Sequence, residues 1–447
     1  MKKFKRFLKG LLIVILVLAV IHGIASMVLS RRVASKLAEI KAQGDPVSMA
    51  DLGKIDIPDS ENGATIYMQI FKEMGRPIEF KNGKYILNWD MKRDPELSRI
   101  LIANEITPDM WMKAEKLLAP YQHAMGMVDE ATSRPRCKFR TNWEDGPDAV
   151  FPHYTVLRSL SRMLMLDARL DARDGKVDKA VHRIGQIFKV GKSLTEDPSV
   201  VSLLLQMEMI TNGLDCIKDI EQDAKISAAQ ARYLDDILAR IDFNSSYQLA
   251  IKGEIALSVY IYNMYIGNAK PSSDMPWYGG IVLCVLRPII LGDELVFLRL
   301  AGDIPKNSSI PYIEMPQSKP GYIGRHGSSR FVLPSSFVIE GYSAIAKNRD
   351  IAISRIRLGR AYLGLIAYKE KFGAYPQSLD ELRSKLGWKV EVDPLTGKDF
   401  HYKRQGAGFL LYGVGPNLRD DGGVFRRRKA TDPPNEEFDD IVWQWAR

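Results

Sequence analysis

The chain has 447 residues, of which 46% are apolar and 26% are charged, a composition typical of globular proteins and unlike that of disordered or fibrous chains. This length is enough for two or three domains with a sizeable hydrophobic core. The net charge of +9 would fit a nucleic-acid-binding protein, but most of it lies in the first 32 residues, which contain no acid and seven basic residues: Lys2, Lys3, Lys5, Arg6, Lys9, Arg31 and Arg32. The rest of the chain is close to neutral, so we expect no nucleic-acid partner.

An apolar stretch, Leu8–Leu29, overlaps the end of this basic N-terminus. No charged residue occurs between Lys9 and Arg31, and about 20 apolar residues are enough for a helix to cross the hydrocarbon core of a membrane. The sequence therefore predicts a transmembrane anchor within residues 1–32. The alternative is a cleaved signal peptide, although its apolar region is normally shorter and the small residues near Ala25 form a poor cleavage site.

The charges on either side of this stretch predict its orientation. Five basic residues precede the uncharged segment and two follow it, and loops rich in Lys and Arg remain on the cytoplasmic side. We therefore expect a single-pass protein of the cytoplasmic (inner) membrane. Its N-terminus would be cytoplasmic, and the chain after Arg31 would be periplasmic or otherwise extracytoplasmic.

Cysteine and histidine do not form recognisable motifs. The cysteines Cys137, Cys216 and Cys284 are far apart and form no CxxC pair, so neither a zinc site nor a disulfide framework is indicated. Cys216 and Cys284 have apolar neighbours in the sequence, and we predict that both are small core residues. The six histidines are dispersed and show no HExxH spacing.

Two acids are the candidates for catalysis. Glu208 in "LLLQMEMI" and Glu254 in "AIKGEIAL" lie in strongly apolar segments that are predicted to be helical. Two buried carboxylates that face each other can act as acid and base. More often such a glutamate pairs with an arginine or lies at the edge of the apolar face. We predict that the protein is not an enzyme, with an envelope hydrolase that uses these two carboxylates as the alternative.

Residues 33–149 are predicted to be a mixed, mostly helical, membrane-proximal region. Asp59 or Ser60 can cap a helix that begins nearby. Asn82-Gly83, in "FKNGKYILNW", can form the turn of a small hairpin.

Residues 150–302 are predicted to be a helical domain. Leu157, Leu160 and Leu164 lie on one face of a helix, a turn follows at Asp174-Gly175, and a second amphipathic helix comes next. Two antiparallel helices joined by a glycine turn form an αα-hairpin, which weakly resembles one tetratricopeptide repeat.

Residues 277–302, "WYGGIVLCVLRPIILGDELVFLRLAG", are apolar enough to suggest a second membrane span. Four residues interrupt the centre of this segment: Arg287, Pro288, Asp293 and Glu294. Charges are costly at the centre of a bilayer. We therefore predict buried helices here instead of a second span.

A stretch rich in Pro, Gly and Ser, residues 303–345, predicts an irregular linker or lobe. A C-terminal module of residues 346–447 follows. In it a long helix from about Asp350 precedes a short helix capped by Ser378 and two strands joined near Gly406. We expect a small α+β module with antiparallel strands at the end of a chain that is mainly α.

The motifs of this module occur in a recognisable order: "YP.SLDEL", "DP.TG..F.Y", "GF.LY..GPN" and a terminal "DDIVWQW". About 95 residues that carry them resemble the soluble domain of type II secretion major pseudopilins. The resemblance implies a helix packed on a small antiparallel sheet. It also implies a loop after the last strand that binds calcium through aspartates and backbone carbonyls.

The resemblance places candidate calcium ligands in this loop. By position, Asn417 and Asp440 correspond to ligands of the family, and Asp420, Asp421 and Asp439 are further oxygen donors nearby. Asn417 lacks the charge of the family's aspartate. The alternative is that Asn417, Asp420 and Asp421 only cap turns.

The N-terminus departs from the pseudopilin pattern. It contains no "GFTLIE"-like stretch, and a long helical region separates the anchor from the C-terminal module, so we do not expect a processed pilus subunit. The whole layout, with "ENGATIY", "RPRCKF" and "WEDG", resembles membrane-anchored proteins of planctomycete-type bacteria, which implies no activity. We predict a membrane-anchored envelope protein whose exported part binds a protein partner or acts as a scaffold. The alternative is a component of a secretion or pilus-type apparatus.

Overall fold

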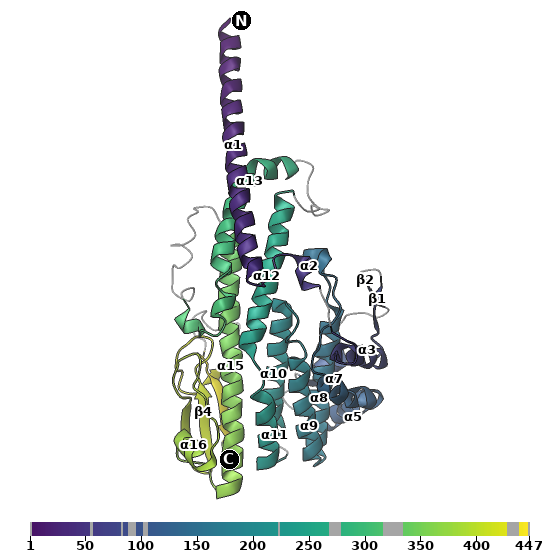
Figure 1. Ribbon diagram of the computed structural model, residues 1–447. Helices are drawn as coiled ribbons and strands as arrows, with labels where there is room; N and C mark the ends of the chain where they lie inside the picture. Colours follow the sequence, from purple (N-terminus) through teal and green to yellow (C-terminus); the bar gives the residue numbers. More distant parts are fainter. Residues whose placement is uncertain are drawn as a thin grey trace.

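The computed structural model describes residues 2–53, 57–81, 84–87, 95–101, 106–221, 224–267, 279–315, 334–426 and 438–445. In these residues the chain is mainly helical, as the sequence predicts, with a small antiparallel sheet near the C-terminus. Figure 1 shows an elongated body of roughly aligned helices, from one end of which a long helix projects.

The projecting helix is α1 (Lys2–Ala42), which contains the predicted anchor. Its apolar side chains face outward: Leu12, Leu16 and Ile21 are 56–68% exposed. Helix α10 (Val200–Ile220) is also long and apolar enough to cross a membrane. However, 61% of its apolar window is buried inside the protein, against 6% for α1. Both helices qualify as candidate spans by length and composition, but α1 is the one whose apolar surface the protein leaves uncovered.

Short elements follow α1, in the region that was predicted to be membrane-proximal: α2 (Met49–Leu52), α3 (Gly63–Glu73), β1 (Ile78–Lys81), β2 (Lys84–Leu87), α4 (Pro95–Leu101), α5 (Pro108–Leu118), η1 (Ala119–Tyr121), α6 (Gln122–Gly126), α7 (Val128–Ser133) and η2 (Trp143–Asp148). Strands β1 and β2 form the predicted hairpin, whose turn at residues 82–83 lies outside the described residues. The predicted cap of α3 is wrong. Asn62, not Asp59 or Ser60, accepts the Ala64 N–H at 3.1 Å, because its amide is fixed by both backbone groups of Lys138.

Long helices form the centre: α8 (Pro152–Arg173), α9 (Val177–Lys192), α10, α11 (Ala228–Leu238), α12 (Phe243–Tyr265) and α13 (Gly279–Ala301). Helices α8 and α9 form the predicted hairpin, and its turn requires Gly175 because φ there is +74°. Helix α10 begins after Ser199, whose side chain accepts the Ser202 N–H. Ser227 and Gln230 form a capping box at α11.

Helix α13 only partly matches the prediction that its segment is buried. Its second half is buried, including Leu291, Leu298 and the acid Glu294. Its first half is exposed, and Cys284, which was predicted to be a core residue, is exposed with it. The apolar sequence did not distinguish the two halves, because burial depends on which neighbours cover each turn.

The C-terminal part contains η3 (Pro305–Asn307), η4 (Tyr312–Glu314), α15 (Pro334–Phe372), α16 (Leu379–Leu386), β3 (His401–Gln405), β4 (Gly408–Gly413), β5 (Phe425–Arg426), β6 (Phe438–Asp439) and β7 (Ile441–Trp445). Helix α15 begins well before Asp350, inside the segment that was predicted to be irregular. The three-stranded sheet has the order β3-β4-β7 and is antiparallel. The terminal "IVWQW" is therefore a third strand beside the two that were predicted.

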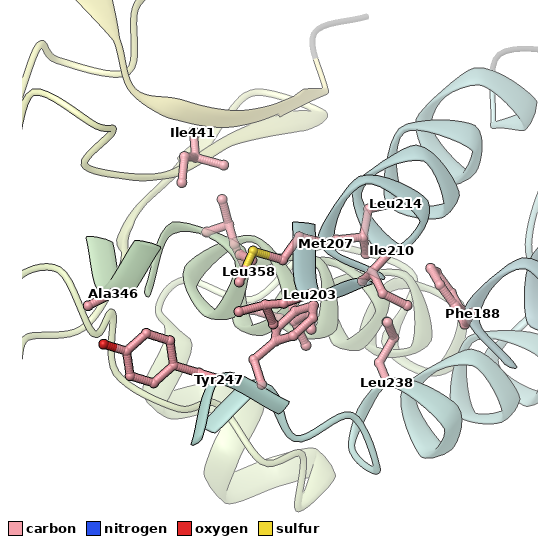
Figure 2. Close-up of a cluster of buried hydrophobic side chains, with 14 of the residues drawn as sticks. Phe188, Leu203, Met207, Ile210, Leu214, Leu238, Tyr247, Ala346, Leu358 and Ile441 are labelled. Atoms are coloured by element: carbon pink, nitrogen blue, oxygen red, sulfur yellow. The ribbon is translucent and has the colours of Figure 1, made fainter. Parts of the chain in front are cut away.

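One hydrophobic cluster joins these parts. Figure 2 shows Met207 and Leu214 of α10 among side chains of α9, α11, α12 and α15, with Ile441 of β7 at one edge. The cluster extends from Val33 in α1 to Trp443 in β7. The helical centre and the C-terminal sheet thus share a core and depend on each other for burial of their apolar surfaces.

The buried carboxyl of Glu294 predicts a pH dependence of stability. It is 1% exposed, its Oε2 has no hydrogen-bond partner among the described residues, and burial raises its pKa to about 7. The folded state therefore holds the proton more tightly than the unfolded chain, and stability falls as the pH rises from about 4.5 to about 7. We expect Glu294→Gln to stabilise the protein at pH 8 by up to ~3 kcal/mol and to change little at pH 4.5.

Thermal unfolding of the full chain in detergent micelles at pH 4.5 and pH 8 measures the effect of Glu294→Gln on stability. Glu314→Gln is the matched control, because Glu314 is exposed, and its unfolding should follow that of the unchanged protein at both pH values. Equal melting temperatures for Glu294→Gln and the unchanged protein at pH 8 would contradict the prediction.

Candidate functional site

A basic pocket lies where three helix ends meet. Its volume is about 330 Å³, within the range of small-ligand sites. Its walls come from the end of α7 and the segment after it, the end of α9 and the segment after it, and the end of α11. The lining contains one acid, Glu196, and five basic residues: Arg134, Arg136, Lys189, Lys192 and Arg240. The pocket therefore favours a negatively charged ligand.

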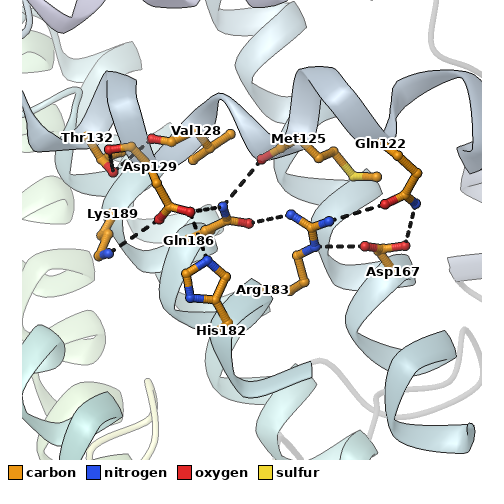
Figure 3. Close-up of polar contacts among 10 residues, drawn as sticks. All are labelled: Gln122, Met125, Val128, Asp129, Thr132, Asp167, His182, Arg183, Gln186 and Lys189. Atoms are coloured by element: carbon orange, nitrogen blue, oxygen red, sulfur yellow. Dashed lines mark hydrogen bonds and ion pairs between the residues drawn. The ribbon is translucent and has the colours of Figure 1, made fainter. Parts of the chain in front are cut away.

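A polar network holds α7 against the α8–α9 hairpin, as Figure 3 shows. Arg183 of α9 donates to Asp167 of α8 at 2.7 Å, and both side chains are largely buried. Gln186 donates to Asp129 of α7 at 2.9 Å, and Lys189 Nζ lies 3.7 Å from the same carboxylate. These contacts place Lys189 on one wall of the pocket, next to the end of α7.

The segment after α7 forms a second wall and is fixed by α3. The Gly63 N–H donates to the Arg136 carbonyl at 2.8 Å. A Cβ at Gly63 would lie 2.5 Å from the Ala131 carbonyl oxygen, so the close approach requires glycine. The Arg136 guanidinium donates to both Glu196 oxygens, with Nε 3.0 Å from Oε2 and 3.1 Å from Oε1. Arg136 is therefore held and largely neutralised.

Two cations of the pocket remain for a ligand. Arg134 lies 3.3 Å from Glu130, and Lys189 is shared with Asp129. Lys192 and Arg240 are exposed, and within the described part of the chain neither forms an ion pair. Lys192 also lies in the last turn of α9, where a positive charge is favourable beside the helix C-terminus. Arg240 follows Ala239, the C-cap of α11, and so lies beside a second helix C-terminus.

The pocket lacks an activated thiol. Cys137 lines it, but burial raises the pKa of the Cys137 thiol, followed in effect by the nearby carboxylates of Glu196 and Asp197. A thiol nucleophile needs the opposite shift, because the thiolate is the reactive form. Cys137 is therefore a structural residue of the wall, and the chemistry that the pocket supports is charge recognition.

The structure does not bring the two predicted catalytic acids together. Glu208 is one-third exposed and pairs with Arg158 at 3.0 Å and with Arg162 at 3.3 Å. Glu254 accepts the backbone N–H of Val200, the first residue of α10, and burial raises its pKa. Residues 200 and 208 lie about 12 Å apart along α10, at 1.5 Å per residue. Each acid has a structural partner of its own.

The aspartate loop is built by carboxylates that accept backbone N–H groups. Asp439 accepts from Asn417 at 3.1 Å, Asp420 accepts from Gly422 at 2.9 Å, and Asp421 accepts from the Asn417 side chain at 2.8 Å. These contacts bring the predicted residues together and match the turn-capping alternative.

Asp440 is the exception in this loop. It is fully buried, and its Oδ2 accepts N–H groups from Asp421 at 3.0 Å and Gly423 at 2.8 Å. Its Oδ1 has no partner among the described residues. Burial, together with the charges of Asp421 and Asp420, raises the pKa of Asp440.

Calcium takes 6–8 oxygen ligands, some of which are backbone carbonyls. Asp440 offers one free carboxylate oxygen, and the described residues include no group of three or more His, Cys, Asp or Glu side chains placed to hold a metal ion. Calcium binding at this loop stays a prediction.

The basic pocket was not predicted from the sequence. Its cations lie in three separate segments, around positions 134–136, 189–192 and 240, and only the fold brings them together. The segment "RPRCKF" was quoted only as part of the layout that resembles planctomycete-type proteins, and its closely spaced basic residues were the available signal. No family model, curated protein or solved structure matches the chain.

Asp440 allows the two explanations of the loop to be separated. Asp440→Asn keeps an oxygen that accepts both N–H groups and removes the buried negative charge that Asp421 and Asp420 oppose, so we expect a higher melting temperature at pH 8. Asp440→Ala leaves both N–H groups without their acceptor and should destabilise by ~1–3 kcal/mol. Unfolding of the full chain is measured in calcium and in chelator.

If backbone groups alone hold the loop, the melting curves in calcium and in chelator coincide. If calcium holds it, the unchanged protein melts higher in calcium, and Asp421→Ala removes the difference. A stabilising effect of calcium that Asp440→Asn abolishes would contradict the backbone explanation.

Proposed function

We propose that the chain is a non-enzymatic, membrane-anchored protein whose helical body binds an acidic segment of a protein partner at the basic pocket. The observation that carries this proposal is the charge of the pocket, which has five basic residues and one acid in a chain that is otherwise close to neutral after its N-terminus. Arg240 and Lys192 are the residues that would contact the partner's carboxylates.

The anchor in this proposal is α1. Its exposed apolar residues need a covering that the described protein does not provide, and a bilayer supplies it. The basic residues at its start orient the N-terminus to the cytoplasm, so the body is extracytoplasmic. The pocket would then face the periplasm or an equivalent compartment.

Binding is favoured over catalysis by the contacts of the candidate groups. Glu208 is neutralised by two arginines, and Glu254 accepts the Val200 N–H at the start of α10. The envelope-hydrolase alternative therefore loses the facing pair of carboxylates that motivated it. The other alternative, a component of a secretion or pilus-type apparatus, rests on the C-terminal motifs alone and is compatible with a binding pocket in the body.

The pocket predicts affinity for an acidic peptide. We expect a fluorescent pentaglutamate peptide to bind the full chain in detergent micelles, with an affinity that falls as salt is raised because the contacts are charge–charge. Lys192→Gln with Arg240→Gln should weaken binding at least tenfold, measured by fluorescence anisotropy.

The matched control is Lys398→Gln with Arg419→Gln, which makes the same change of charge at exposed positions on the C-terminal module. This pair should leave the affinity unchanged. Equal weakening by both pairs would show that binding follows net charge alone, and it would remove the pocket from the proposal.

The orientation predicts where each end of the chain lies. Alkaline phosphatase, which is active only outside the cytoplasm, should be active in a bacterial host when it is fused after Arg447. The same enzyme fused after Gly10, before the apolar stretch, should be inactive. The opposite pattern would mean that the body is cytoplasmic, against the charge distribution around α1.

A further inference from the structure

The first half of α13 exposes an apolar face that no described part of the protein covers. Ile281, Val285 and Ile289 recur every four residues on one face and are 63%, 65% and 50% exposed. Val282 is also exposed, at 47%. In Figure 1 these first turns lie across α1, at the end of the body from which α1 projects. The face therefore adjoins the helix whose apolar surface is the proposed membrane span.

A proline in α13 releases a backbone carbonyl beside α1. Pro288 lies inside the helix and has no N–H, so the Cys284 carbonyl, four residues earlier, lacks its helical donor. His22 of α1 supplies one: its Nε2 donates to the Cys284 oxygen at 3.0 Å and also lies 3.2 Å from the Val285 oxygen. This contact gives the polar His22 a partner within the apolar stretch of α1.

The need for such a donor is greatest in lipid. Water can satisfy a released carbonyl at an aqueous surface, but in hydrocarbon only a protein group can do so. His22 lies seven residues before Leu29, the end of the apolar stretch, which is about 10 Å at 1.5 Å per residue. The first half of α13 therefore lies at the depth where amphipathic helices rest in a leaflet.

The segment is too short to cross the membrane. Its uninterrupted apolar run, Ile281–Leu286, is far below the ~20 residues that a span requires. Arg287 follows, and its guanidinium donates to the Ile266 carbonyl at the end of α12 at 3.3 Å. The charge is thereby held toward the body, which fits a helix that lies in the plane of the leaflet.

We propose that residues 279–289 form a second membrane-embedded element, an in-plane helix that packs on α1 and is covered by lipid acyl chains. Lipid is the occupant because the exposed face continues the outward apolar surface of α1, which the bilayer covers, and because the released Cys284 carbonyl is paired inside the protein. The proposal rests on the membrane anchor proposed above, and its test separates the two.

Cys284 is a natural reporter of this environment. It is exposed, whereas the other two cysteines of the chain, Cys137 and Cys216, are buried. The full chain is labelled with bimane and reconstituted in phosphatidylcholine vesicles that contain doxyl-labelled phosphatidylcholine. We expect the doxyl lipid to quench the label at Cys284 at least twofold.

Two controls in a Cys284→Ser background give the quenching expected for a label inside the membrane and for a label in water. Leu16→Cys, in the exposed apolar part of α1, reports a membrane span and should be quenched. Val201→Cys, 53% exposed on the body, should not be quenched. Quenching at Leu16→Cys but not at Cys284 overturns the in-plane helix and keeps the anchor. No quenching at either position overturns both.

Reaction with a membrane-impermeant maleimide before labelling shows whether Cys284 is surrounded by water or by protein instead of lipid. A Cys284 that reacts as fast as Val201→Cys lies in water. A Cys284 that is protected without being quenched is covered by protein, such as a second copy of the chain. Either result overturns the proposal.

The pairing of His22 with the released carbonyl has its own test. His22→Ala should lower the melting temperature in vesicles, since the Cys284 carbonyl then lacks a donor. In a Pro288→Ala background the N–H of residue 288 can serve that carbonyl, so the same change should have little effect. Equal effects in both backgrounds would overturn the role of Pro288.

Discussion

Helix α10 (Val200–Ile220) is buried on opposite faces, and the rest of the body is arranged around it. Leu205 and Met209 pack in one hydrophobic cluster with α3, α5 and α8, whereas Leu203 and Met207 pack in another with α12, α15 and the sheet. Gly213 allows the ring of Phe188 to approach, because a Cβ there would lie 2.4 Å from that ring. The short elements that follow α1 and the C-terminal sheet are thus held by the same helix.

Buried charge pairs decide how α15 sits against this centre. Arg360 Nε donates to Asp235 of α11 at 2.7 Å, and both side chains are buried. Its Nη1 donates to Glu391 at 2.6 Å, and the Trp388 indole donates to the Arg360 carbonyl at 3.0 Å. Any other placement of α15 would leave a buried charge without its partner, which costs more than the pair itself contributes.

Apolar and basic surfaces lie at different places on the molecule. The apolar face of α13 adjoins the projecting part of α1, whereas α7, α9 and α11, which build the basic pocket, lie toward the other end of the body in Figure 1. A partner at the pocket would therefore be held away from the bilayer. Since the chain after its N-terminus is nearly neutral, the proposed recognition would depend on the charges placed at the pocket rather than on the field of the whole protein.

Signals within a few residues were sufficient for much of the architecture. The length of the apolar stretch predicted α1, the 3.6-residue period predicted the α8–α9 hairpin, and the local cap at Ser378 predicted the start of α16. Each of these depends on hydrogen bonds or hydrophobic faces inside a single element. The gathering of Asn417 and its neighbouring aspartates could be foreseen for the same reason, since most of them share one loop.

Tertiary structure alone decided the features that depend on neighbours distant in sequence. The basic pocket needs Arg136, Lys192 and Arg240 from three segments, and no periodicity records that they meet. The first half of α13 is exposed, whereas the second half is covered by the core although it contains Asp293 and Glu294. Glu208 pairs with Arg158 of α8, whereas Glu254 of α12 accepts the Val200 N–H of α10. These different partners follow from the packing of α10 against α8 and α12, which the sequence alone did not reveal. Burial and pairing are properties of the folded chain, because the groups that surround each side chain come from segments distant in sequence. The residues next to it in the chain do not determine which segments these are.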